Sequence, residues 1–161
     1  MSGLLPLLQE FHREKLALFL RHQSSARHVN QYDFNNTYQY IVAREETQLS
    51  WLAQAIQELD GNPPEAVETD REMAGKARDL ARTAIENDAR EAQAFVERWR
   101  PRVDAMSNAR HRGMLRVILG ETLEQKRFFE QALAGRTDLL GRRADQPEAA
   151  RGEVLPNRWI E

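Results

Sequence analysis

Residues 34–60, FNNTYQYIVAREETQLSWLAQAIQELD, decide the fold that this chain can adopt. Side chains that suit an interior recur there every three to four residues, which is the period of one face of an α-helix. Gly61 is expected to adopt the left-handed conformation that ends many helices, and Pro63 and Pro64 prevent continuation. The pattern predicts a long amphipathic helix that ends at about residue 60, with an inward stripe of Phe34, Tyr38, Ile41, Glu45, Gln48, Leu52, Ala55 and Leu59.

Three further segments show the same period and predict helices over residues 2–23, from 69 or 70 to 99, and from 107 or 108 to 134. Thr69 or Asp70 can cap the second of these helices, and Ser107 or Asn108 can cap the third. Pro101 is expected to bend or stop the helix that precedes it. Short connections between consecutive helices favour neighbours that run in opposite directions. We therefore predict an all-α fold, an antiparallel four-helix bundle.

The chain of 161 residues, 41% hydrophobic and 30% charged, has the size and composition of one ordered domain. We assign residues 1–140 to the bundle and residues 141–161 to an extended C-terminal tail, because that last segment has no periodic apolar face. Residues 154–161, VLPNRWIE, return apolar groups to the tail. Two interpretations stay open: this end packs on the surface of its own domain, or it docks on a protein partner.

The composition argues against several classes of function. A formal net charge of −2, from 23 basic and 25 acidic residues, leaves no basic excess for binding nucleic acid. The absence of cysteine rules out disulfides, thiolate metal sites and cysteine nucleophiles. No apolar run approaches the roughly 20 residues that span a bilayer, and the first residues do not resemble a signal peptide. We therefore expect a cytoplasmic protein that binds neither nucleic acid nor membrane.

Polar residues interrupt the apolar stripes near the middle of each predicted helix. A buried carboxylate costs several kcal/mol unless it is paired, protonated or bound to a metal, so acids on an inward stripe need a reason. We predict that these side chains meet at one level inside the bundle. They are His12 in the first helix, Glu45 and Gln48 in the second, Asp88 in the third, and Thr122 and Gln125 in the fourth.

Two stretches carry a resemblance to a known family. Residues 45–52, EETQLSWL, are followed by residues 56–63, IQELDGNP, and the last helix contains residues 118–129, ILGETLEQKRFF. Together they resemble the ferritin-like superfamily, bacterioferritin and rubrerythrin in particular, over about residues 4–134. The resemblance implies a bundle in which a Glu from the first and third helices and a Glu-x-x-His pair from the second and fourth hold two irons. Such a centre binds iron and activates dioxygen.

The resemblance gives this chain an incomplete set of ligands on the second and fourth helices. Glu45 matches the glutamate of the family's second helix, but Gln48 stands where its histidine lies. Thr122 and Gln125 stand at the Glu and His positions of the fourth helix. Both imidazoles are thus replaced by amides in matched positions. Because an amide can donate to a carboxylate and accept from a neighbour, the substitution suggests a site rebuilt as a hydrogen-bond network.

The remaining ligand positions allow alternatives. If the match to the family's fourth helix is shifted by one residue, Glu121 and Glu124 take the Glu and His positions, and an imidazole is still missing. His12 has the phase of the first-helix ligand. The third-helix acid is best matched by Asp88, with Glu86 and Glu91 as alternatives.

Two hypotheses about function follow. The first is a ferritin-like protein with a degraded di-iron centre, which serves as a non-catalytic structural or interaction module, binds no cofactor and forms a homo-oligomer. The alternative is an iron- or manganese-binding oxidase, peroxidase or iron-storage protein that uses a reduced set of ligands. Whether the protein is an enzyme stays open at this point. The metal ligands in the alternative would be drawn from Glu45, Asp88, His12, Gln48, Gln125, Glu121 and Glu124.

Overall fold

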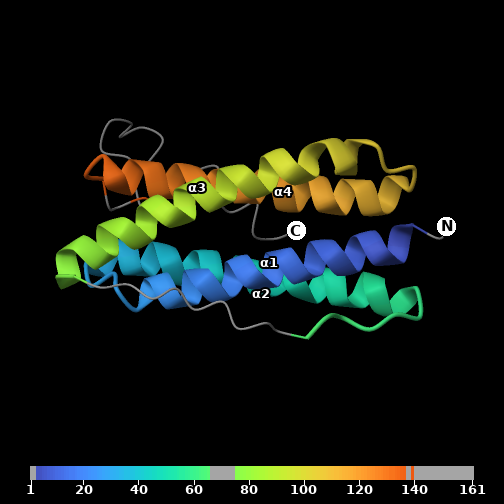
Figure 1. Cartoon of the computed structure of the whole chain (residues 1–161), viewed down its shortest axis with the longest axis horizontal. Coiled ribbons are helices and arrows are strands. Elements are labelled where there is room, and N and C mark those ends of the chain that lie inside the picture. Colours follow the sequence, from blue (N-terminus) through green and yellow to red (C-terminus); the bar gives the residue numbers. More distant parts are fainter. Residues whose placement is uncertain (1–2, 66–74, 137–138, 140–161) are drawn as a thin grey trace, which may run out of the picture.

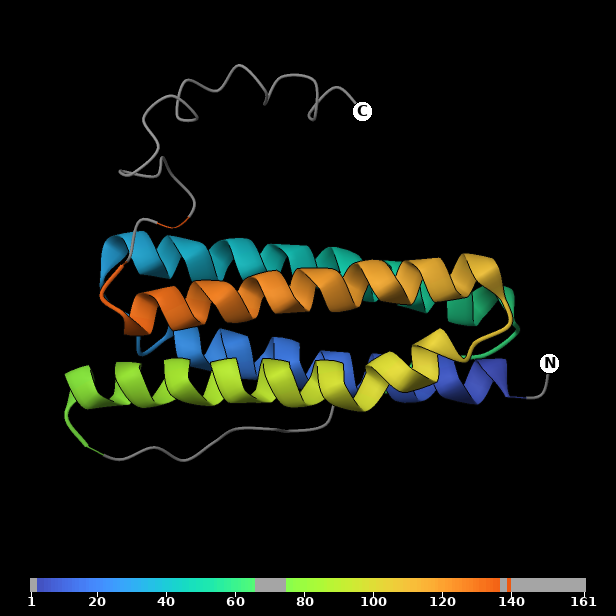
Figure 2. The same cartoon turned by 90° about the horizontal axis from the view of Figure 1, so that it is seen from above.

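The computed structural model describes residues 3–65, 75–136 and 139, and in this part of the chain every regular element is a helix (Figures 1 and 2). Four helices form a bundle, which confirms the predicted all-α class. None of the described helices is long and apolar enough to cross a membrane. The predicted tail, residues 141–161, lies outside the described residues. The helices are α1 (Leu4–Ala26), α2 (Tyr32–Glu58), α3 (Ala77–Asp104) and α4 (Ala109–Leu133).

The helix ends follow local capping chemistry. Asn108 caps α4 as predicted, because its side-chain oxygen accepts a hydrogen bond from the backbone N–H of His111 at 3.0 Å. Gln31 does the same for α2 through the N–H of Phe34. α3 begins at Ala77 with Lys76 at its N-cap position, so the predicted caps, Thr69 and Asp70, do not cap it; those two residues lie outside the described residues.

The structure differs from the prediction at two helix ends. Of the two outcomes expected at Pro101, a bend or a stop, the stop is wrong, because α3 continues to Asp104. A proline this close to a C-terminus removes one hydrogen bond, and its own carbonyl still accepts from the N–H of Ala105. At the end of α2 the left-handed residue is Asp60, with φ of 63°, rather than Gly61. Gly61 lies close to the side chain of Leu5 on α1, because a Cβ at Gly61 would be 2.5 Å from a methyl carbon of Leu5.

The connections differ in length more than predicted. Residues 27–31 join α1 to α2, and residues 105–108 join α3 to α4. Both of these connections are short, as predicted. Residues 59–76 separate α2 from α3, so this connection is not the short one that was expected. Its described beginning folds back on α1, where the side-chain amide of Gln9 donates to the backbone carbonyl of Asn62.

Charged contacts join the two helix hairpins along their sides. Between α1 and α3, Glu10 pairs with Arg102 and Glu14 pairs with Arg98. Between α2 and α4, Arg44 pairs with Glu121 at 2.7 Å. Figure 2 shows α1 beside α3 and α2 beside α4 along the length of the bundle.

The interior contains two apolar clusters separated along each helix by polar positions. The first cluster includes Phe11, Leu52, Phe95, Trp99 and Leu115. The second lies toward the other end of the helices and includes Phe34, Tyr38, Ile41, Ile85 and Phe129. The apolar clusters bury side chains from all four helices, and this burial supplies most of the stability of such a bundle.

Candidate functional site

A layer of polar side chains lies between the two apolar clusters. Every member is at most 3% exposed, so the layer has almost no access to water. The predicted burial of Glu45, Gln48, Asp88, Thr122 and Gln125 is confirmed. We call this set the polar layer; it consists of Lys15 and His22 from α1, Tyr38, Glu45 and Gln48 from α2, Asp88 from α3, and Thr122 and Gln125 from α4.

Glu45 lies at the centre of the polar layer, between two side chains of α1. Its Oε2 is 2.9 Å from the Nζ of Lys15, and its Oε1 is 2.6 Å from the Nδ1 of His22. All of these side chains are at most 1% exposed. Lys15 and His22 are seven residues apart, which places them on one face of α1, two turns from each other. The carboxylate of Glu45 is therefore held by a cation on each side.

The electrostatic environment keeps this group of side chains ionised. Burial by itself would raise the pKa of Glu45, but the charges of His22 and Lys15 and their hydrogen bonds outweigh it and lower the pKa. Burial would likewise lower the pKa of His22, but the attraction of Glu45 and Asp88 outweighs it and raises the pKa. Glu45 is thus a carboxylate at neutral pH, and its charge favours the protonated form of His22 beside it.

Lys15 reaches a second helix through a hydroxyl group. Its Nζ donates to the Oγ1 of Thr122 at 3.3 Å, and Thr122 in turn donates to the backbone carbonyl of Ile118 at 2.8 Å. The ammonium also lies 5.7 Å from the centre of the Phe95 ring, within the range of a cation–π contact. Side chains from α2, α3 and α4 therefore surround one charge carried by α1.

Asp88 joins the layer through Tyr38, whose hydroxyl donates to its Oδ2 at 2.5 Å. The Tyr38 ring also makes an edge contact with the His22 ring, at 6.4 Å between centroids. Asp88 is the buried acid of α3, as the stripe phase predicted. The alternatives lie at the surface: Glu86 pairs with Arg82 on its own helix, and Glu91 pairs with Arg21.

The two glutamines of the polar layer, Gln48 and Gln125, are both buried. Gln48 donates from Nε2 to the Oε1 of Glu121 at 2.7 Å, and Glu121 also receives Arg44. The Oε1 atoms of Gln48 and Gln125 have no hydrogen-bond partner among the described residues. Glu121 is therefore at the edge of the polar layer. Glu124 points elsewhere, because its side chain is 45% exposed and pairs with Arg127 on α4.

His12 is buried, but no hydrogen bond or ion pair links it to the polar layer within the described residues. Its Nδ1 has no partner there, and its pKa is lowered by burial and by the nearby charge of Arg13. Of the predicted set, the structure thus brings together Glu45 and Thr122 through Lys15, and Gln48 and Glu121 directly.

Lys15 and His22 are the members of the polar layer that the sequence analysis missed. Lysine is rarely buried, because its ammonium normally reaches water. The signal was present in the spacing, since Leu8, Phe11, Lys15, Leu18 and His22 follow the alternating three- and four-residue steps of an inward stripe. The predicted inward stripe of this helix lies on a neighbouring phase that runs through His12.

No group of three or more His, Asp or Glu side chains is placed to hold a metal ion in the described part of the chain. The Oε2 of Glu45 faces the Nζ of Lys15. No protein-family model, curated protein or solved structure matches this chain. What the site can do must therefore be inferred from its own chemistry.

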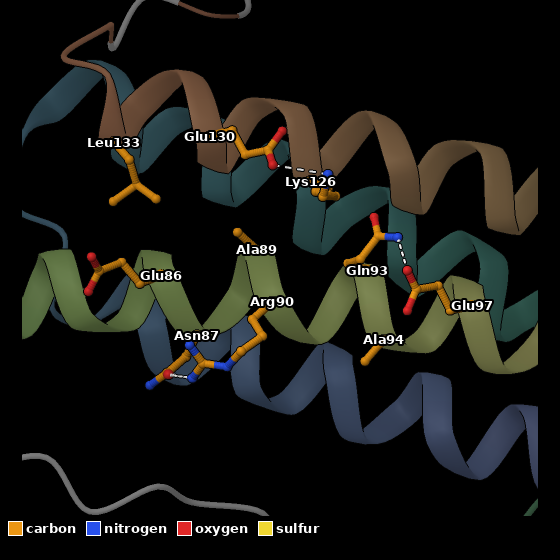
Figure 3. A pocket seen from close by; sticks show the side chains of 10 residues that line it. All are labelled: Glu86, Asn87, Ala89, Arg90, Gln93, Ala94, Glu97, Lys126, Glu130 and Leu133. Atoms are coloured by element: carbon orange, nitrogen blue, oxygen red, sulfur yellow. Dashed lines mark hydrogen bonds and ion pairs between the residues drawn. The ribbon is translucent and has the colours of Figure 1, made fainter.

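A groove on the surface between α3 and α4 does not involve the polar layer (Figure 3). Its polar groups already pair with one another: Lys126 with Glu130 at 3.0 Å, and Gln93 with Glu97. None of the side chains that line it belongs to the polar layer. The groove is an open, solvated surface rather than an entrance to the buried charges.

Proposed function

We propose that this protein is a ferritin-like, antiparallel bundle that works without a metal, as a non-catalytic structural or interaction module that self-associates. The observation that carries the proposal is the buried ion pair between Lys15 and Glu45 at 2.9 Å. It places the side-chain nitrogen of Lys15 against the one carboxylate that best matches a ligand of the family's di-iron centre.

The contacts between helices support a ferritin-like topology. Three ion pairs join α1 to α3: Glu10 with Arg102, Glu14 with Arg98, and Arg21 with Glu91. Residues later in α1 pair with residues earlier in α3, as expected for helices that run in opposite directions. A bundle of this family has one long connection among short ones, and residues 59–76 correspond to it.

The charges of the polar layer support independence from metal. Lys15 and His22 provide two cations, and Glu45 and Asp88 provide two carboxyl groups, so the layer approaches neutrality without an added ion. A divalent cation bound to Glu45 would stand beside the ammonium of Lys15, and like charges at such a distance in a low-dielectric interior repel strongly. Gln48 and Gln125 add hydrogen-bonding groups without adding charge.

The unpartnered oxygens of Gln48 and Gln125, and the unpartnered Nδ1 of His12, favour a second candidate function. In that alternative the protein binds iron or manganese through these groups with Glu45, Asp88 and Glu121 or Glu124, and performs oxidase, peroxidase or storage chemistry. It requires Lys15 to move away from Glu45 when the metal enters, and this breaks the buried ion pair.

Elemental analysis separates the two functions. Protein purified after growth in iron- and manganese-rich medium should contain far less than one ion per chain. Its melting temperature should not change on addition of ferrous or manganous salts or of a chelator. Stoichiometric metal that disappears in Glu45→Gln and stays in Glu46→Gln, the matched control with an exposed carboxylate on the same helix, would overturn the proposal and establish the metalloprotein.

A further inference from the structure

One face of α4 is not covered by any other described helix. It follows the steps of three and four residues that define a helix–helix contact, but its members are exposed or half-exposed rather than buried. Val117, at its middle, is 50% exposed and is one of the large apolar side chains left on the described surface. We call this face the α4 seam; it consists of Arg110, Gly113, Val117, Gly120, Glu124 and Arg127.

The two glycines of the seam are unexplained within a single chain. Glycine is among the poorest residues in the interior of a helix, yet Gly113 and Gly120 both lie well inside α4. A Cβ added to either would meet nothing within 4 Å. This contrasts with Gly61, where Leu5 leaves no space. Glycine on both sides of Val117 would, however, allow the backbone of another helix to come close.

The charges of the seam are complementary to those of its own reversed copy. Arg110 and Glu124 lie equally far along the chain on either side of Val117. If two α4 helices cross at Val117 in opposite directions, Arg110 of each chain faces Glu124 of the partner subunit, and the glycines face each other. A two-fold axis repeats every such contact, so the two ion pairs close the contact at both ends.

Arg110 and Glu124 already have partners within the chain, but these partners do not prevent them from pairing with a second copy. Arg110 pairs with Glu58 at 3.3 Å and Glu124 with Arg127, and all of these side chains are more than 40% exposed. Exposed ion pairs of this kind contribute little to stability, so either can be replaced. Arg116, which flanks the seam, is already neutralised by Asp104 at 3.1 Å and would not repel its copy strongly.

We propose that the α4 seam is the interface through which two copies of this chain form a two-fold dimer. The inference rests on the self-association included in the proposed function and names the surface that performs it. The contact centres on Val117, with Gly113 and Gly120 allowing close approach and two Arg110–Glu124 pairs fixing the direction. A second copy is the occupant because the charge pattern matches itself in reverse.

Sedimentation equilibrium of the full chain over a range of concentrations tests this surface. Wild type should show a dimer whose dissociation constant rises with salt, and Val117→Arg should be monomeric. Arg110→Glu and Glu124→Arg should each weaken the dimer about tenfold, because like charges then face each other across the contact. The double variant should restore the dimer, since it exchanges the charges and keeps the pairs.

Arg100→Glu, which makes the same charge change at an exposed position of α3, is the matched control and should leave the dissociation constant unchanged. Circular dichroism establishes that each variant is folded. A dimer that persists in Val117→Arg and ignores the charge reversals would overturn the α4 seam while leaving self-association intact. Wild type that stays monomeric would remove both, whereas the metal measurement tests the rest of the proposed function separately.

Discussion

The protein places carboxylates against cations in two settings that differ in their access to water. On the side formed by α1 and α3, Glu10 receives Arg102 through two parallel hydrogen bonds of 2.9 Å. Inside the bundle, Glu45 receives Lys15 at the same distance. The first pair is about 40% exposed, whereas the second is fully buried. Distance and chemistry are similar, but the medium around the charges is not.

This difference in exposure determines how much each pair contributes to stability. An exposed pair loses little when it breaks, because water solvates both partners. A buried pair repays a large desolvation cost only while both partners are present, and loss of one leaves an uncompensated charge. The surface pairs therefore help to align α1 with α3, while the buried pair constrains which residues the four helices can accept around it.

Lys15→Met should have the largest effect, because it leaves the carboxylate of Glu45 with one cation instead of two. We expect a loss of about 3–5 kcal/mol in the free energy of unfolding, measured by urea denaturation. A loss below about 1 kcal/mol would mean that the buried pair behaves like an exposed one, and the comparison would fail.

Removing both partners should cost less than removing one. In Lys15→Met with Glu45→Leu, the carboxylate that Lys15 neutralised is removed as well, although His22 loses its acceptor. We expect the double variant to be more stable than Lys15→Met alone, by roughly 1–3 kcal/mol. A double-mutant cycle measures this coupling, and additive losses would contradict it.

His22→Leu removes the second cation next to Glu45 and should cost about 1.5–3 kcal/mol near neutral pH, the value of a hydrogen bond to a charged group. Because the pKa of His22 is raised in the folded protein, its contribution is fully present below the unfolded pKa, near 6.5. It is lost as the pH rises from there through the folded pKa. The stability difference between wild type and His22→Leu should therefore shrink with rising pH, and a difference that grows would reverse the assigned direction.

Arg102→Met should have the smallest effect, below about 1 kcal/mol in the free energy of unfolding, and the effect should decrease further in high salt. The Arg102 guanidinium also lies 4.1 Å from the centre of the Trp99 ring, and methionine keeps part of that contact. Chemical denaturation at low and high salt checks both statements. A cost equal to that of Lys15→Met would show that exposure does not separate the two kinds of pair.

The sequence analysis predicted the helices better than it predicted the partners of the buried polar groups. The burial of Glu45, Gln48 and Asp88 followed from their phase on the helices, and the structure confirms it. The partner of Asp88, by contrast, is the hydroxyl of Tyr38, fifty residues away, and no local spacing indicates that contact. The connection of residues 59–76 was also underestimated, because no periodic signal shows where α3 begins.

By itself, the sequence determined that the chain forms helices, where α2 and α4 lie, and that several acids and amides occupy inward positions. Periodicity and capping are properties of neighbouring residues, so they can be derived without coordinates. Only the tertiary structure decided that the cation facing Glu45 is Lys15, and that Gly113 and Gly120 lie on an open face rather than against another helix. Those facts depend on how each helix is rotated about its axis, and packing of all four helices fixes that rotation.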